Sequence, residues 1–165
     1  MATITRRGAL VHTIGELPAV GTPLPPFTLT GNDMTDLDAG VIGGRRVVLN
    51  IFPSIDTGVC ATSVRRFNQL AAGLANTLVL CVSADLPYAQ ARFCGAEGIE
   101  NVITASSFRS TFGSDYGVTM LDGGMRGLLS RAVVVADADG RVLYTEQVPN
   151  ISSEPDYDAA LAALG

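Results

Sequence analysis

The fold is decided by residues 47–60, which read VVLNIFPSIDTGVC. Residues 47–52 are apolar on nearly every position of both faces, which is the pattern of a strand in a sheet that helices cover on both sides. Pro53 ends this strand, and apolar side chains recur at helical spacing over residues 59–73. The stretch therefore predicts a central strand that leads into a helix, with Cys60 in the first turn of that helix.

The alternation of strand and helix extends outward from this stretch. The further predicted elements are strands over 2–5, 9–13, 27–30, 77–83, 102–105, 132–136 and 141–145, and helices over 87–95, 108–116 and 156–164. The first two strands predict an N-terminal β-hairpin, and strands separated by helices predict parallel pairing with right-handed crossovers. This order is typical of one thioredoxin-like α/β domain over residues 1–165, with a central mixed β-sheet flanked by helices.

Composition excludes several classes of protein. Residues of the hydrophobic class make up 47% of the 165-residue chain and charged residues 16%, so the sequence predicts a folded domain with a substantial core. Eleven Lys and Arg against sixteen Asp and Glu give a net charge of −5, which argues against nucleic acid as a partner. No apolar run approaches the roughly 18 residues of a membrane span.

The cysteine count and the N-terminal residues bear on the compartment. Three cysteines are too few, and odd in number, for a disulfide-stapled secreted domain, which favours a reducing cytoplasm. Arg6 and Arg7 resemble the start of a twin-arginine export signal, but the apolar run after them stops at His12. We therefore expect a soluble cytoplasmic protein.

Cys60 is the first candidate for chemistry. Unpaired N–H groups and the helix dipole at a helix N-terminus favour the thiolate, which is the nucleophilic form of cysteine. The carboxyl edge of an open α/β sheet is also where such folds usually bind ligands. If Thr57 is the N-cap, its hydroxyl can accept a hydrogen bond from the N–H of Cys60. Position alone leaves a second interpretation open, because a cysteine on a helix face often serves only the core.

A family resemblance favours the catalytic interpretation. Pro53, Thr57 and Cys60 form the pattern P-x-x-x-T-x-x-C, which resembles the peroxidatic motif of the peroxiredoxins. The chain resembles the bacterial thiol peroxidases, the atypical two-cysteine branch of that family, over essentially its whole length. The resemblance is carried by Gly8 and by residues 15–18, 50–57, 60–65, 82–87, 92–94, 112–118, 127–132 and 144–155.

The resemblance implies a role for each site residue. Cys60 is the peroxidatic cysteine, which attacks a hydroperoxide and becomes a sulfenic acid. Pro53, Thr57 and Arg131 bind the substrate, and Thr57 and Arg131 stabilise charge on the leaving oxygen. Cys94 is the resolving cysteine, which closes an intramolecular disulfide with Cys60. The resemblance further implies thioredoxin as the reductant, a homodimer, and no metal or organic cofactor.

Several residues are ambiguous without the resemblance. Arg131 precedes the predicted strand 132–136 and could lie at either rim of the sheet or simply be solvated. Cys81 lies inside a predicted buried strand and is expected to serve only the core. His12 has no second histidine or close cysteine pair with which to bind zinc. The apolar loop residues Val118, Met120, Leu121 and Met125 are compatible with a buried partner surface.

The spacing of the two active cysteines predicts a conformational change. Cys94 lies about seven residues into its helix, so its sulfur is roughly 10 Å along that axis. A disulfide needs Cα atoms within about 7 Å. We therefore expect local unwinding around Cys60 and Cys94 before the disulfide forms.

Two alternatives to a peroxidase remain open. The first is a redox-sensing binding protein in which oxidation of Cys60 changes the shape and passes a disulfide to a partner. The second is a structural homologue without reactivity, because Gly58 stands where a proline is usual after the motif threonine. Glycine leaves the active-site turn looser than proline would.

Overall fold

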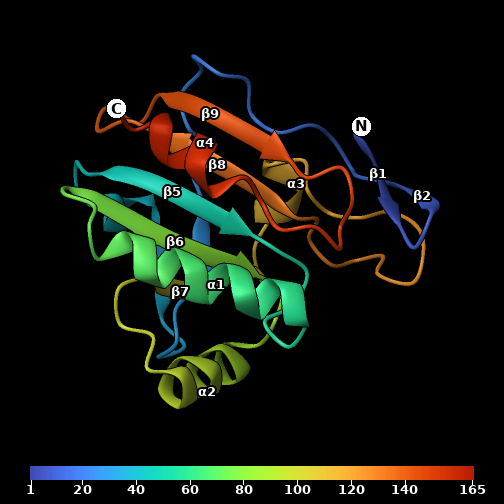
Figure 1. The fold of residues 1–165 in the computed structure, drawn as a ribbon, viewed down its shortest axis with the longest axis horizontal. Coiled ribbons are helices and arrows are strands. Elements are labelled where there is room, and N and C mark those ends of the chain that lie inside the picture. The colour runs from blue at the N-terminus through green and yellow to red at the C-terminus, as the bar shows by residue number, and fades with distance from the viewer.

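A seven-stranded mixed sheet forms the centre of the molecule (Figure 1), in a computed structural model that describes all residues 1–165. Its order is β4-β3-β7-β6-β5-β8-β9, with β5, β6 and β7 parallel and their outer neighbours antiparallel. The strands are β3 (Thr28–Thr30), β4 (Asp36–Asp38), β5 (Arg46–Ile51), β6 (Thr77–Ser83), β7 (Ile103–Ser106), β8 (Ala132–Ala136) and β9 (Val142–Gln147). The predicted central strand is thus β5, which lies between β6 and β8.

Helices cover both faces of this sheet. They are α1 (Gly58–Ala71), α2 (Pro87–Glu97), α3 (Phe112–Asp115) and α4 (Tyr157–Ala162). One core contains Val48 and Phe52 of the central strand region with Val64 and Phe67 of α1, and the opposite core contains Leu49 with Phe112. Figure 1 shows α1 and α4 in front of the sheet and α3 behind it. The central strand is therefore buried on both faces, as its composition predicts.

An N-terminal β-hairpin forms a second, small sheet. It consists of β1 (Thr3–Arg6) and β2 (Ala9–His12), which pair antiparallel. Ile4 and Val11 of the hairpin pack with Met120 and Ile151 in a separate apolar cluster. The hairpin is consequently fixed to the body of the domain beside residues 149–151.

The fold confirms most of the predicted elements. The structure adds an edge strand, β4, and a short 3-10 helix, η1 (Ala39–Ile42), which the sequence analysis did not predict. Among the helices of the structure, none is both long and apolar enough to cross a membrane.

The predicted partner surface is wrong in part. Val118 and Met120 are 0% and 1% exposed, because they pack inside the chain's own apolar clusters. Met125 packs partly against the hairpin cluster, and Leu121 is 44% exposed. Of the four residues, Leu121 and, in part, Met125 are therefore exposed enough to contact a partner as expected.

Candidate active site

The loop between β5 and α1 presents Cys60 at the carboxyl edge of the sheet. Thr57 caps α1 with extended backbone (φ −90°, ψ 148°), and its Oγ1 accepts from the N–H of Cys60 at 3.3 Å. Cys60 is completely buried, in the core between α1 and the sheet. The predicted N-cap is thus confirmed, and it fixes the backbone of the cysteine.

Arg131 lies against the sulfur of Cys60. Because β8 runs antiparallel to β5 and pairs Ala132 with Ile51, the residue before β8 lies beside the end of β5 where the active-site loop begins. Nη2 of Arg131 is 3.4 Å from Sγ of Cys60. The pairing therefore decides which rim Arg131 occupies, which the sequence left open.

The guanidinium of Arg131 is held by one carbonyl. Its Nε and Nη2 donate to the carbonyl oxygen of Ile151 at 3.0 and 2.9 Å, and the residue is only 2% exposed. Its Nη1 is buried and has no hydrogen-bond partner. A buried, unpaired donor on a cation is costly unless a ligand supplies the acceptor. The solvated alternative for Arg131 is wrong, and one donor remains free for an oxygen atom.

A pocket of about 320 Å³ opens beside this pair. It is lined by Arg6, Arg7, Thr57, Gly58, Val59, Met125, Arg131, Ile151 and Ser152. Its wall includes Val59, the residue directly before the buried cysteine, and two of the three predicted substrate-binding residues, Thr57 and Arg131. Pro53 is buried between the end of β5 and this loop, and it does not line the pocket.

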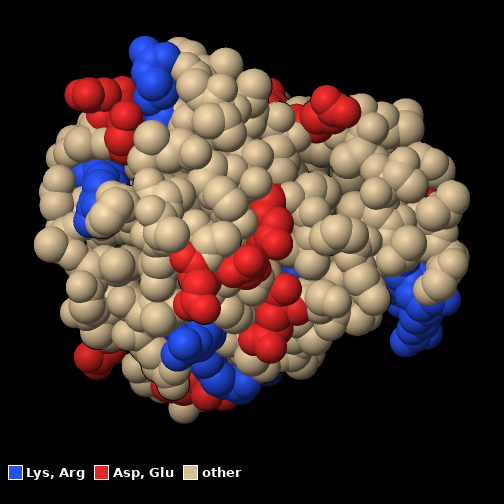
Figure 2. Space-filling view, turned by 45° about the horizontal axis from the view of Figure 1, so that its top comes forward, with Lys and Arg blue, Asp and Glu red and all other residues tan.

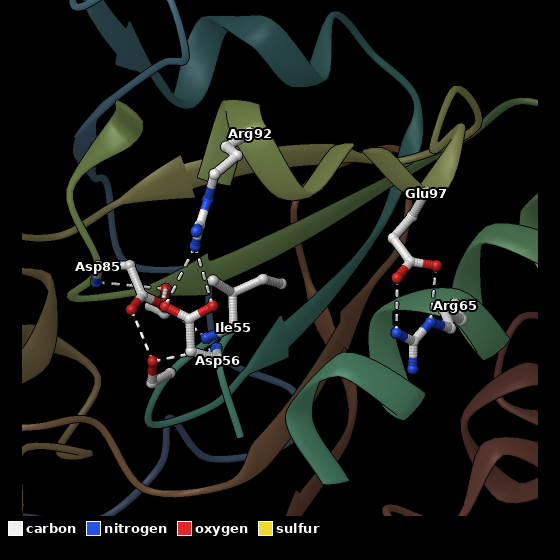
Figure 3. A network of polar contacts seen from close by, with 8 residues as sticks. Ile55, Asp56, Arg65, Asp85, Arg92 and Glu97 are labelled. Atoms are coloured by element: carbon white, nitrogen blue, oxygen red, sulfur yellow. Dashed lines mark hydrogen bonds and ion pairs between the residues drawn. The ribbon is translucent and has the colours of Figure 1, made fainter. Parts of the chain in front are cut away.

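A carboxylate that the sequence analysis missed supports the active-site loop. Asp85 follows β6, and its carboxylate accepts from the N–H of Ile55 and the hydroxyl of Ser54, both at 2.7 Å, and from Ser83 at 2.6 Å. Figure 3 shows Asp85 turned toward Ile55. The sequence could have indicated this role, because Asp85 comes just after a parallel strand and so lies at the same edge of the sheet as the motif.

Cys94 lies in α2, away from the pocket beside Cys60. It is half-buried, its Sγ lies 3.4 Å from Oγ1 of Thr104, and it lines a different pocket. All three cysteines are free thiols. Cys94 therefore lines a pocket separate from the one beside the buried Cys60, and the predicted unwinding stays a prediction.

Two ion pairs connect α2 to the active-site region (Figure 3). Nη2 of Arg92 in α2 is 3.2 Å from Asp56 in the loop before α1. Arg65 of α1 makes a two-pronged contact with Glu97 of α2, at 3.0 and 2.7 Å. Both pairs are partly exposed, so each stabilises the docked helix only weakly.

The surroundings of Cys81 and His12 account for both residues without a catalytic role. Cys81 is fully buried in β6, and burial raises the pKa of its thiol to about 12. It is therefore protonated at neutral pH and is a poor nucleophile. His12 ends β2, and its Nδ1 lies 2.7 Å from Oδ2 of Asp122.

Comparison with known proteins now identifies the family. The model of the family described as Redoxin matches residues 19–161. The chain belongs to the redoxin family. The thiol peroxidase of Mycobacterium tuberculosis strain H37Rv is 63% identical over 165 residues, covering 100% of this chain and 99% of that one. The thiol peroxidase of Corynebacterium glutamicum is 56% identical over 164 residues, covering 99% of each.

Solved structures agree with this placement in the redoxin family. A peroxiredoxin-like protein from Aquifex aeolicus superposes with a TM-score of 0.93 at 36% identity, covering 98% of this chain and 95% of that one. A thiol peroxidase from Chromobacterium violaceum gives a TM-score of 0.90 at 23% identity, covering 97% and 93%. The resemblance to the thiol peroxidases that the motif predicts is thereby confirmed, and so is the thioredoxin-like fold.

Proposed function

We propose that this redoxin reduces organic hydroperoxides and hydrogen peroxide at Cys60. The thiolate sulfur attacks the terminal oxygen of the hydroperoxide, so an S–O bond forms as the O–O bond breaks. The other oxygen leaves with the electron pair and takes a proton, giving an alcohol or water. Cys60 is oxidised to a sulfenic acid and the peroxide is reduced.

The contact between Arg131 and Cys60 carries this proposal. Negative charge develops on the leaving oxygen in the transition state, and a fixed cation beside the sulfur stabilises it. Nη2 is 3.4 Å from the sulfur and Nη1 is buried without a partner, so one donor is available to the peroxide. Thr57 holds the N–H of Cys60, and Pro53 shapes the loop from behind rather than touching the pocket.

Cys94 is the proposed resolving cysteine. Its thiol attacks the sulfenic sulfur, an S–S bond forms, and the sulfenic oxygen leaves as water. In the reduced conformation Cys60 is buried and Cys94 lines another pocket, so we expect local unwinding around both cysteines, with movement of α2, before this step. The helix is suited to moving, because it buries only the side chains of Pro87 and Gln90.

An external dithiol must return the disulfide to two thiols. We assign this step to thioredoxin, since it supplies a paired dithiol of low potential. Gly95 and Ala96, the exposed residues of α2 that directly follow Cys94, are available for contact with it once the disulfide has formed.

Turnover tests the proposal. With thioredoxin, its reductase and NADPH present, the wild-type protein is expected to consume many equivalents of cumene hydroperoxide, whereas Cys60→Ser consumes none. Cys81→Ser serves as the matched control, since Cys81 is equally buried but protonated. Consumption that stops after one equivalent of peroxide would instead indicate a redox sensor, and no oxidation of thiol would indicate an inactive homologue.

A further inference from the structure

The pocket beside Cys60 is positively charged in a negatively charged protein. Its wall contains Arg6, Arg7 and Arg131 and no acidic residue, whereas the chain carries a net charge of −5. Figure 2 shows acidic side chains near the middle of one face and a separate basic group at its right, the side on which Figure 1 places the β1–β2 hairpin. A concave site lined by one sign of charge attracts ligands of the opposite sign.

The charges of Arg6 and Arg7 are not neutralised by any carboxylate of the chain. Arg6 is half-buried and Arg7 is exposed, and neither takes part in an ion pair of the structure. An added Cβ at Gly124 would lie only 3.1 Å from Nη1 of Arg6, so this guanidinium lies against the backbone of the 122–127 loop. Two cations without counterions at one pocket, one of them half-buried, favour an anionic ligand.

The turn of the hairpin does not require an arginine. Arg6 pairs with Ala9, so the turn consists of Arg7 and Gly8, both with positive φ (52° and 80°). Asparagine, aspartate or glycine is the usual first residue of such a two-residue turn, because they adopt this conformation most readily. The backbone at Arg7 is therefore mildly strained for its residue type, and the fold alone gives no reason for arginine there.

The hairpin is connected to the catalytic arginine through Ile151. The N–H of Ile151 donates to the carbonyl of Thr5 at 3.0 Å, and the N–H of Thr5 donates to the carbonyl of Pro149 at 2.8 Å. The carbonyl of Ile151 in turn accepts both bonds from Arg131. The strand that carries Arg6 is thus fixed relative to the thiol, as a specificity site requires.

We propose that Arg6 and Arg7 select hydroperoxides that carry a carboxylate. The apolar side chains of Val59, Met125 and Ile151 line the same pocket and fit the hydrocarbon body of such a molecule. The hydroperoxide end meets Arg131 and Cys60, and the carboxylate accepts hydrogen bonds from the hairpin arginines. This inference rests on the proposed peroxidase function and adds a preference for charge to it.

The test compares two hydroperoxides that differ only in charge. The probes are para-carboxycumene hydroperoxide and its neutral carboxamide, and the readout is the ratio of their kcat/KM values. The ratio cancels any general effect of a substitution on folding. For the wild-type protein the carboxylate is expected to be the better substrate, and its advantage shrinks as ionic strength rises.

Arg6→Gln and Arg7→Gln are measured singly and together. We expect the double variant to lower the ratio about five- to tenfold, since two partly exposed ion pairs are lost. Arg141→Gln is the matched control, because it removes the same charge from an exposed residue just before β9, at the opposite end of the sheet.

Three outcomes would overturn the inference. If the ratio of the two kcat/KM values is the same in the wild-type protein and the double variant, the two arginines do not contribute to the preference for the carboxylate. A wild-type ratio below one shows that the pocket disfavours the carboxylate. In both of these cases the proposed peroxidase function stands, provided that the wild-type protein reduces the neutral amide. The third outcome is a wild-type protein that reduces neither probe, which contradicts the proposed function and this inference together.

Discussion

Arg131 is held by the carbonyl of Ile151 and by the sulfur of Cys60, and it keeps one buried donor free. Hydrogen bonds from a fixed cation are strongest where water is excluded, and this residue is 2% exposed. Its contribution therefore falls mainly on the transition state, in which negative charge appears on the leaving oxygen.

Arg131→Met is expected to lower the second-order rate of Cys60 oxidation about a hundred- to a thousand-fold, the usual effect of losing one such donor. Stopped-flow measurement of peroxide consumption checks this. Arg46→Met is the matched control, because Arg46 likewise makes two hydrogen bonds to backbone carbonyls, those of Ala75 and Leu164, but lies at the opposite end of β5. Equal losses in both variants would mean that Arg131 serves only the fold.

Gly58 begins α1 and has room for a larger residue. An added Cβ meets nothing within 4 Å, and Thr57 before it has the extended backbone that a following proline requires. Gly58→Pro should therefore raise the free energy of unfolding by about 0.4–1 kcal/mol, because it restricts the unfolded chain. Urea denaturation of the reduced protein measures this, with Gly58→Ala as the intermediate control.

The same substitution is expected to slow closure of the disulfide, since a stiffer first turn unwinds less readily. A lower unfolding midpoint for Gly58→Pro, or a disulfide that closes at the wild-type rate, would contradict this account of Gly58.

The site residues differ in how far the sequence predicts them. Thr57 and Cys60 follow from the motif and from local capping rules, so their arrangement was predictable. The rim occupied by Arg131 depends on the antiparallel direction of β8, which no local pattern encodes. Asp85 was missed because its partners at residues 54 and 55 are distant in sequence.

At the scale of elements, α2 combines a weak attachment with the proposed resolving cysteine. Hydrogen bonding to Arg65 holds the pKa of Glu97 below its ordinary value. A carboxyl with a lowered folded pKa stabilises the docked state above its unfolded pKa, and this contribution is lost as the pH falls through the folded pKa. Docking of α2 should accordingly weaken in acid.

Glu97→Gln is expected to increase amide hydrogen exchange across residues 87–97 at neutral pH and to speed disulfide closure. At a pH below the folded pKa of Glu97, wild-type and variant should exchange alike, because the protonated wild-type carboxyl is then uncharged, as the glutamine side chain is at every pH. Glu100→Gln is the control, since Glu100 is exposed and forms no ion pair. Unchanged exchange in Glu97→Gln at neutral pH would show that this pair does not hold α2.

The strongly apolar strands were predictable, and the edge of the sheet was not. β5, β6 and β8 are nearly continuous apolar runs that only a doubly covered sheet explains. β4 reads Asp-Leu-Asp and has two exposed residues, which gives it no such signal. Val118 and Met120 were misjudged because the hairpin that buries Met120 lies more than a hundred residues away in sequence.

For the whole molecule, apolar side chains remain exposed at the carboxyl edge of the sheet. Leu86 and Tyr88 follow β6 and are 53% and 68% exposed, and Phe108 follows the adjacent strand β7 and is 40% exposed. An exposed apolar patch of this kind is typical of an interface. We expect this face to be the contact in the homodimer that the family resemblance implies.

Sedimentation velocity at micromolar concentration tests the dimer. The wild-type protein is expected to sediment as two chains, and the double variant Tyr88→Glu with Phe108→Glu as one, because two buried charges destabilise the contact. Leu10→Glu, at a residue 65% exposed on the hairpin, should leave the dimer intact. A monomeric wild-type protein, or a double variant that remains dimeric, would contradict this assignment.

The account as a whole depends on Cys60 reacting first and Cys94 second. Peptide-mapped mass spectrometry after one equivalent of an alkyl hydroperoxide tests this most directly, on the wild-type protein beside Cys60→Ser and Cys94→Ser. We predict a Cys60–Cys94 disulfide in the wild-type protein, sulfenic or further oxidised Cys60 in Cys94→Ser, and no oxidation in Cys60→Ser. Oxidation of Cys81 in place of Cys60, or three thiols left intact, would contradict the account.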